Sequence, residues 1–245
     1  MKYCILTFFI FTNTFSFAQD IDFIKIVSEQ LDLDKSKIKR ELFTYKTIPN
    51  NQSETIVVIP EISNEDEDDY FFELNSYILI VDSKTGKIKN QYYESSKTNN
   101  WTSDAVVLSE IIIDTAPYQI SEEKRAFGIR VNYYGMSKPN PYSNTTISLF
   151  IKSKNKLIKI LDSYDVMDYG GEWDTNCAGE FIDENKVLIL SSNKTNGYYD
   201  ILVKNKITTT KNFENENGDC DYKEKVTSQS TQLKYNGKKY KENVL

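Results

Sequence analysis

Four acidic residues gather around a tryptophan in the segment 168–203, DYGGEWDTNCAGEFIDENKVLILSSNKTNGYYDILV. The acids are Glu172, Asp174, Glu180 and Asp183, and the aromatic residue is Trp173. A glycoside hydrolase needs two carboxylates that face each other, one of them with a raised pKa. If residues 170–176 form a loop and residues 178–181 a strand, Glu172 and Glu180 converge. One hypothesis is therefore a secreted hydrolase that uses Glu172 with Glu180 or Asp174, with Trp173 stacking on a sugar.

The same segment also supports a binding site without catalysis. Here Gly170 and Gly171 form a turn, the loop that follows is rigid, and Trp173 is an exposed anchor flanked by Glu172 and Asp174. An aromatic ring between two anions suits a basic protein partner. A third interpretation places Trp173 in the core and treats the acids as surface charges. We favour the binding site and assign no catalytic residue.

A calcium site is the other candidate in this segment. Residues 192–200, SNKTNGYYD, align with the D-x-D-x-D-G-x-x-D loop that binds calcium in FG-GAP-type repeats. Asn196 and Asp200 fit the pattern, but Ser192 and Lys194 replace the first two acids, and a lysine ammonium repels Ca²⁺. We therefore expect a hairpin turn without metal and no cofactor, with Asn196 and Asp200 as the residual candidate ligands.

The chain contains no histidine. This excludes catalysis by a Ser-His-Asp or Cys-His arrangement and every zinc site that depends on histidine.

The first 18 residues, MKYCILTFFIFTNTFSFA, have the pattern of a secretory signal peptide. Lys2 supplies the positive start, an apolar run follows, and Ser16 and Ala18 satisfy the small-residue rule for cleavage. The apolar run is too short for a membrane span, which needs about 20 residues. We expect an exported bacterial protein, periplasmic or secreted, whose mature chain begins at Gln19 and has no membrane span.

Two cysteines remain after removal of that peptide, Cys177 and Cys220. In an oxidising compartment an even pair is most simply a disulfide, and two buried free thiols are the alternative.

The charge of the chain argues against nucleic acid as a partner. The net charge is −6, and loss of residues 1–18, which hold one lysine and no acid, makes it −7. Binding to phosphates requires a basic surface.

Hydrophobic spacing predicts a helical N-terminus over about 20–41, followed by strands. Apolar residues recur at intervals of three and four in 21–31. Hairpins are predicted over residues 76–93, 146–161, 186–203 and 230–242, with Asn236-Gly237 the strongest turn signal. We therefore expect one β-rich domain, 19–245, in which an antiparallel hairpin meander forms a partial propeller-like sheet or a sandwich.

Several segments resemble a group of uncharacterised exported bacterial proteins: IDTAPYQISEEKRAFGIRV, NPYSNTTISLF, GGEWDTNCAGEF, NGYYDILV and YNGKKY. The last two are also similar to segments of FG-GAP-like proteins and of periplasmic inhibitors of lysozyme-type enzymes. This resemblance implies a binding protein rather than an enzyme. Our expectation is therefore an exported binding or inhibitory module that acts through protein contacts; the alternatives are the hydrolase and a structural envelope component.

Overall fold

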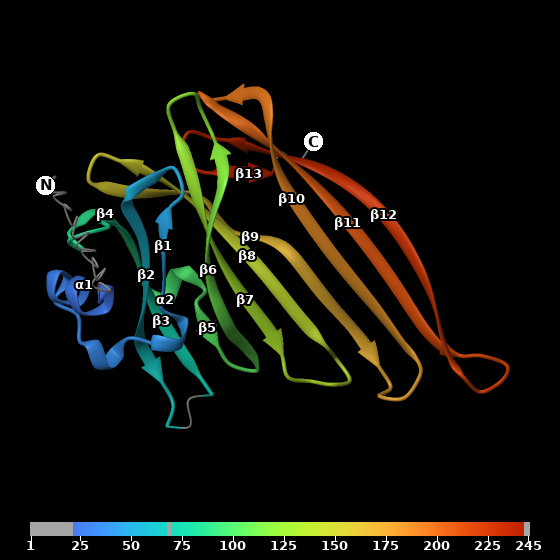
Figure 1. The fold of residues 1–245 in the computed structure, drawn as a ribbon. Coiled ribbons are helices and arrows are strands. Elements are labelled where there is room, and N and C mark those ends of the chain that lie inside the picture. The colour runs from blue at the N-terminus through green and yellow to red at the C-terminus, as the bar shows by residue number, and fades with distance from the viewer. Residues whose placement is uncertain (1–21, 68–69, 243–245) are drawn as a thin grey trace, which may run out of the picture.

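The computed structural model describes residues 22–67 and 70–242, so the predicted signal peptide lies outside the described residues. The chain is mainly β, with a 13-stranded, mostly antiparallel sheet and a short helix near its N-terminus (Figure 1). The prediction of a β-rich meander with a helical start is confirmed. The sheet is open, and it folds back over itself rather than splitting into two separate sheets.

The first third of the chain forms a helix-covered sheet. Its elements are α1 Phe23–Leu31, η1 Lys35–Lys37, η2 Arg40–Leu42, β1 Thr44–Ile48, β2 Asn51–Glu65, β3 Phe72–Asp82 and β4 Ile88–Glu94. Asp22 starts α1, because its side chain accepts a hydrogen bond from the Lys25 N–H at 3.0 Å. The predicted helical segment therefore contains one α-helix and two short 3₁₀ turns.

Strand β2 is buried on both faces between residues 55 and 60. Val57 and Ile59 belong to the core beneath α1, whereas Ile56 and Val58 belong to a core shared with β6 to β8. A strand covered on both sides loses the alternation of polar and apolar residues, which accounts for the continuous apolar run TIVVIP.

The middle of the chain forms the layer that packs on β2 and β3. Its elements are α2 Ser96–Asn99, β5 Thr102–Ser103, β6 Val106–Gln119, β7 Arg125–Gly135, β8 Tyr142–Ser153 and β9 Lys156–Trp173. Residues 105–114, whose apolar run is compatible with a strand or a helix, lie mostly in β6. One parallel pair, Gln91 with Lys156, joins β4 to β9 and makes the sheet continuous.

The C-terminal strands are β10 Gly179–Thr195, β11 Tyr198–Glu214, β12 Cys220–Tyr235 and β13 Tyr240–Glu242. Strand β10 pairs with β9 only through residues 179–185 and then separates from it. Around residues 188–203 and 233–240 these strands form a further hydrophobic core with β7 to β9, which includes Ile147, Ile160, Ile201 and Leu233.

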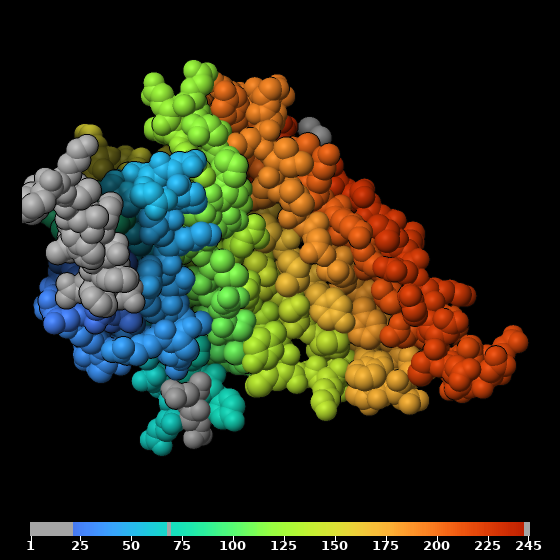
Figure 2. All heavy atoms as spheres, in the orientation of Figure 1, coloured from blue at the N-terminus to red at the C-terminus, as the bar shows by residue number. Residues whose placement is uncertain are grey.

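The other ends of these strands form what we call the single-layer region: residues 167–173 of β9, 179–187 of β10, 204–214 of β11 and 220–230 of β12. Every residue from 220 to 230 is exposed. Figures 1 and 2 show these strands, in orange and red, extending away from α1 and the first sheet. Both faces of this region are therefore largely open to solvent.

Candidate functional site

The segment GGEWDTNCAGEF is the hairpin end of β9 and β10. Residues 170–173 lie within β9, so the prediction of a Gly-Gly turn and a presenting loop is wrong for these four residues. The turn consists of residues 174–178. Asp174 closes it, because its Oδ1 accepts hydrogen bonds from the N–H groups of Asn176 at 2.8 Å and Ala178 at 3.0 Å.

Glycines are disfavoured inside strands, and the ring of Phe181 explains two of them here. A Cβ atom at Gly171 would lie 2.5 Å from Phe181 Cδ1 and 2.5 Å from the carbonyl oxygen of Glu180. A Cβ atom at Gly179 would lie 3.0 Å from the same ring. The ring therefore covers bare backbone on this side of the sheet, and it stacks on Tyr169 with centroids 6.2 Å apart.

Gly171→Ala is expected to lower the free energy of unfolding by about 1–3 kcal/mol, because the new methyl group overlaps backbone and ring atoms that cannot both move away. Gly170→Ala is the matched control, since its Cβ would meet no atom nearer than 3.9 Å. Chemical denaturation of the two variants checks the prediction. Equal stability of the two alanine variants would contradict it.

Side chains alternate along β9 and β10 and so define two faces of the hairpin. The aromatic face carries residues 169, 171 and 173 with 179, 181 and 183; the acidic face carries residues 168, 170 and 172 with 180, 182 and 184. Trp173 and Glu172 therefore point to opposite faces. Trp173 is half-buried, and its backbone N–H donates to the carbonyl of Pro139 at 2.7 Å. The predicted arrangement of Trp173 between Glu172 and Asp174 is not formed on one face.

Glu172 and Glu180 do converge, as the hydrolase hypothesis anticipated, because they are direct cross-strand partners. Both are exposed. The Glu180 carboxylate accepts from Lys211 Nζ at 2.5 Å. Neighbouring carboxylates on one sheet face repel each other.

A second like-charge pair, Asp168 with Glu184, lies on the same face. The exposed side chain of Ile182, opposite Gly170, separates the two pairs. Glu184 accepts from Asn205 Nδ2 at 2.7 Å and lies 3.9 Å from Lys186 Nζ. We call Asp168, Glu172, Glu180 and Glu184 the acidic cluster.

Sequence reasoning missed Asp168, Ile182 and Glu184. Asp183, which it included among the clustered acids, lies on the aromatic face. Apolar alternation could not have found these three residues, because DYGGE and EFIDE do not alternate between polar and apolar positions.

The hollow beside this hairpin is broad and open. Its volume is 660 Å³, and its lining includes Pro139, Glu172, Trp173, Glu180 and Lys211. The two glutamates lie side by side on one sheet face, not on opposing walls of a cleft. A substrate between two facing carboxylates is therefore not accommodated by this pair.

The disulfide between Cys177 and Cys220 is present, as predicted. It connects the turn of residues 174–178 to the first residue of β12, across the end of β11. The bond therefore fastens three strands together at the tip of the single-layer region.

The calcium candidates lie near the opposite end of β11. Asn196 has a φ of 49° in the β10–β11 turn, and its Nδ2 donates to the Tyr235 carbonyl at 2.7 Å. Asp200 is buried, and its Oδ2 accepts from Gln232 Nε2 at 3.2 Å. Within residues 22–67 and 70–242, no group of three or more Cys, Asp or Glu residues is arranged to hold a metal ion.

Comparison of the chain with family models, with curated proteins and with solved structures gives no match. In the part of the chain that the structure describes, no helix has the length and apolar character of a membrane span.

Proposed function

We propose that the protein is an exported binding module that holds a basic protein partner against the acidic face of the β9–β10 hairpin. The observation that carries this proposal is the pair of directly opposed carboxylates on either side of an exposed isoleucine. Glu172 faces Glu180, and Asp168 faces Glu184, with Ile182 between the pairs.

Like charges that are direct neighbours across two strands destabilise a sheet. Lysine or arginine side chains of a partner would remove this repulsion and would form charge-assisted hydrogen bonds with the same oxygens. Ile182 would supply the apolar contact at the centre of such an interface, with the charges around it. The arrangement is therefore costly in the free protein and favourable in a complex.

The geometry favours binding over hydrolysis. A glycosidase places its two carboxylates on either side of the scissile bond and raises the pKa of one by its surroundings. Here both glutamates lie exposed side by side on one face of the sheet, and Lys211 forms a solvent-exposed ion pair with Glu180.

Export is part of the same proposal. The Cys177–Cys220 bond supports it, because structural disulfides persist in oxidising compartments. The resemblance to periplasmic inhibitors makes basic, lysozyme-type cell-wall hydrolases the first class of partner to test.

Neutralising the acidic cluster (Asp168→Asn with Glu172→Gln, Glu180→Gln and Glu184→Gln) is expected to weaken binding to a basic lysozyme-type enzyme by at least about tenfold. The melting temperature should stay the same or rise, because the like-charge repulsion disappears. Isothermal titration calorimetry and a thermal melt check the two effects on the same variant. Loss of binding together with a gain in stability is the signature of a surface kept for a partner.

The matched control removes four exposed glutamates elsewhere, Glu65, Glu67, Glu110 and Glu123, by substitution with glutamine. It has the same net charge as the cluster variant, so a difference between the two reports position and not total charge. Unchanged binding in the cluster variant, or an equal loss in the control, would disprove the proposal. Absence of binding by the wild-type protein would exclude this class of partner.

A further inference from the structure

A second hollow lies between the first sheet and the layer of β6 to β8. Its volume is 180 Å³, and its apolar lining consists of Ile48, Ile56, Ile80, Ala126 and Phe127. These residues come from β1, β2, β3 and β7. The pocket therefore lies between the two packed layers.

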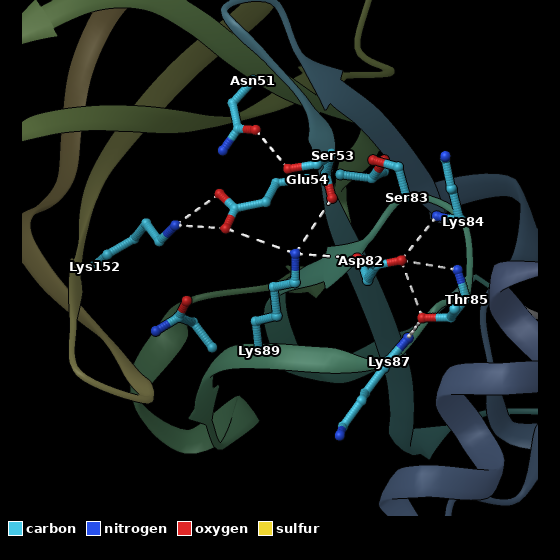
Figure 3. Close-up of polar contacts among 12 residues, drawn as sticks. Asn51, Ser53, Glu54, Asp82, Ser83, Lys84, Thr85, Lys87, Lys89 and Lys152 are labelled. Atoms are coloured by element: carbon cyan, nitrogen blue, oxygen red, sulfur yellow. Dashed lines mark hydrogen bonds and ion pairs between the residues drawn. The ribbon is translucent and has the colours of Figure 1, made fainter.

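The polar rim of this pocket is tied across the two layers by an ion pair. Lys152 of β8 donates to both carboxylate oxygens of Glu54 of β2, at 2.6 and 2.8 Å (Figure 3). Lys89 Nζ lies 4.0 Å from Glu54 and 3.2 Å from Asp82, and it donates to the Ser53 carbonyl at 3.4 Å. The Glu54 carboxylate, whose side chain is 12% exposed, is thus neutralised by two lysines.

Arg125 lines the same pocket from the start of β7. Its guanidinium donates one hydrogen bond, from Nη2 to the Thr115 carbonyl at 2.8 Å. Among the described residues, Arg125 forms no ion pair, unlike Arg130 on the same strand, which bonds to Asp114 at 2.8 Å. A guanidinium has five N–H donors in a planar fork that matches a carboxylate, and only one of those of Arg125 bonds to another described residue.

We propose that this pocket binds a small monocarboxylate with an apolar chain, the carboxylate on Arg125 and the chain against Ile56, Ile80 and Phe127. The charge of the rim selects the head group. Two cations, Arg125 and Lys152, line the pocket with one carboxylate, Glu54, which is already paired. A cationic ligand would have to displace Lys152 from Glu54, whereas an anionic ligand meets Arg125, which pairs with no carboxylate of residues 22–67 and 70–242.

The volume of the pocket limits the length of the ligand's apolar chain. An apolar cavity of about 150 Å³ holds a benzene molecule, which has six carbons. A pocket of 180 Å³ therefore suits a chain or ring of roughly six carbons. Such a ligand is independent of the acidic face, which lies on β9 and β10.

The test is a titration of the protein with sodium hexanoate, followed by isothermal calorimetry and by NMR shifts of the pocket residues. Acetate, which has the head group without the chain, and hexylammonium, which has the chain with the opposite charge, are the matched probes. Saturable binding of hexanoate is expected, with both other probes at least about tenfold weaker. No saturable binding of hexanoate, or equal binding of hexylammonium, would overturn the proposal.

Two variants locate the site. Arg125→Gln should weaken hexanoate binding by roughly tenfold to a hundredfold, the effect of removing a charge-assisted pair. Ile48→Phe should abolish binding by filling the pocket, and Arg40→Gln, at an exposed arginine in η2, should leave it unchanged. A thermal melt verifies that each variant is folded. Hexanoate affinity that survives in folded Arg125→Gln would also overturn the proposal, and Ile48→Phe keeps it testable if Arg125→Gln does not fold.

Discussion

Replacing both Cys177 and Cys220 with serine is expected to lower the free energy of unfolding by about 4 kcal/mol. The two cysteines are 43 residues apart, and the stabilisation follows from the chain entropy that a loop of this length loses in the unfolded state. For a chain of this size the melting temperature should fall by roughly 10 °C. The loss of stability should also be large within the single-layer region, because the disulfide connects the strands at its tip and this region has solvent on both faces.

Reduction of the wild-type protein is the internal control for this prediction. Dithiothreitol should lower the melting temperature of the wild type as far as the double substitution does, and it should leave the double variant unchanged. Hydrogen exchange should show the greatest loss of protection in residues 167–173 and 220–230. Two titratable thiols in the native protein, or a double variant as stable as the wild type, would refute the prediction.

Lys159→Ala is expected to destabilise the protein by about 3 kcal/mol, because it removes the lysine that pairs with the largely buried Glu94 carboxylate. The Lys159 side chain is 5% exposed, and its Nζ bonds to Glu94 of β4 at 2.6 Å and to Asp162 of β9. Asp162 also bonds to Lys239 at 2.6 Å, in the turn between β12 and β13. The network thus connects the first sheet, β9 and the C-terminal hairpin.

Lys239→Ala is the control for this network, because its side chain is 41% exposed and an exposed ion pair contributes about 0–1 kcal/mol. Denaturant unfolding of the two alanine variants measures the difference. A loss below 1 kcal/mol for Lys159→Ala would show that the network contributes little.

The pH dependence gives a second measurement on the same variants. Desolvation raises the pKa of Asp162, but the hydrogen bonds from Lys159 and Lys239 outweigh it and hold this pKa below its usual value. A lowered folded-state pKa stabilises the protein above the unfolded-state pKa of about 4, and this stability is lost as the pH falls through the folded-state value. The stability of Lys159→Ala should therefore depend less steeply on pH in this acid range.

The sequence alone predicted the β-rich meander, the helical start and the disulfide. Apolar residues alternate along a strand that has one face in a core, so hairpins such as 146–161 and 186–203 could be predicted from their pattern. The pairing of Cys177 with Cys220 followed from their being the two cysteines left after the predicted signal peptide.

The ends of the long strands were not predicted. Strand β9 continues through residues 170–173, where the glycines and polar residues suggested a loop over 170–176. Polar and apolar residues alternate along a strand when one of its faces is buried. A single layer with solvent on both faces does not require this alternation. For Gly171 the compensating contact is the Phe181 ring, ten positions later in the chain.

Only the tertiary structure decided which charges meet. The register of β9 with β10 opposes Asp168 to Glu184 and Glu172 to Glu180, and a slip of one residue would have placed each acid against a residue of the other face. Likewise, Glu54 and Lys152 are 98 residues apart and come together because two sheet layers pack on each other. Local sequence determines the face on which a side chain lies, but register and layer packing, which depend on contacts across the whole chain, determine its neighbours.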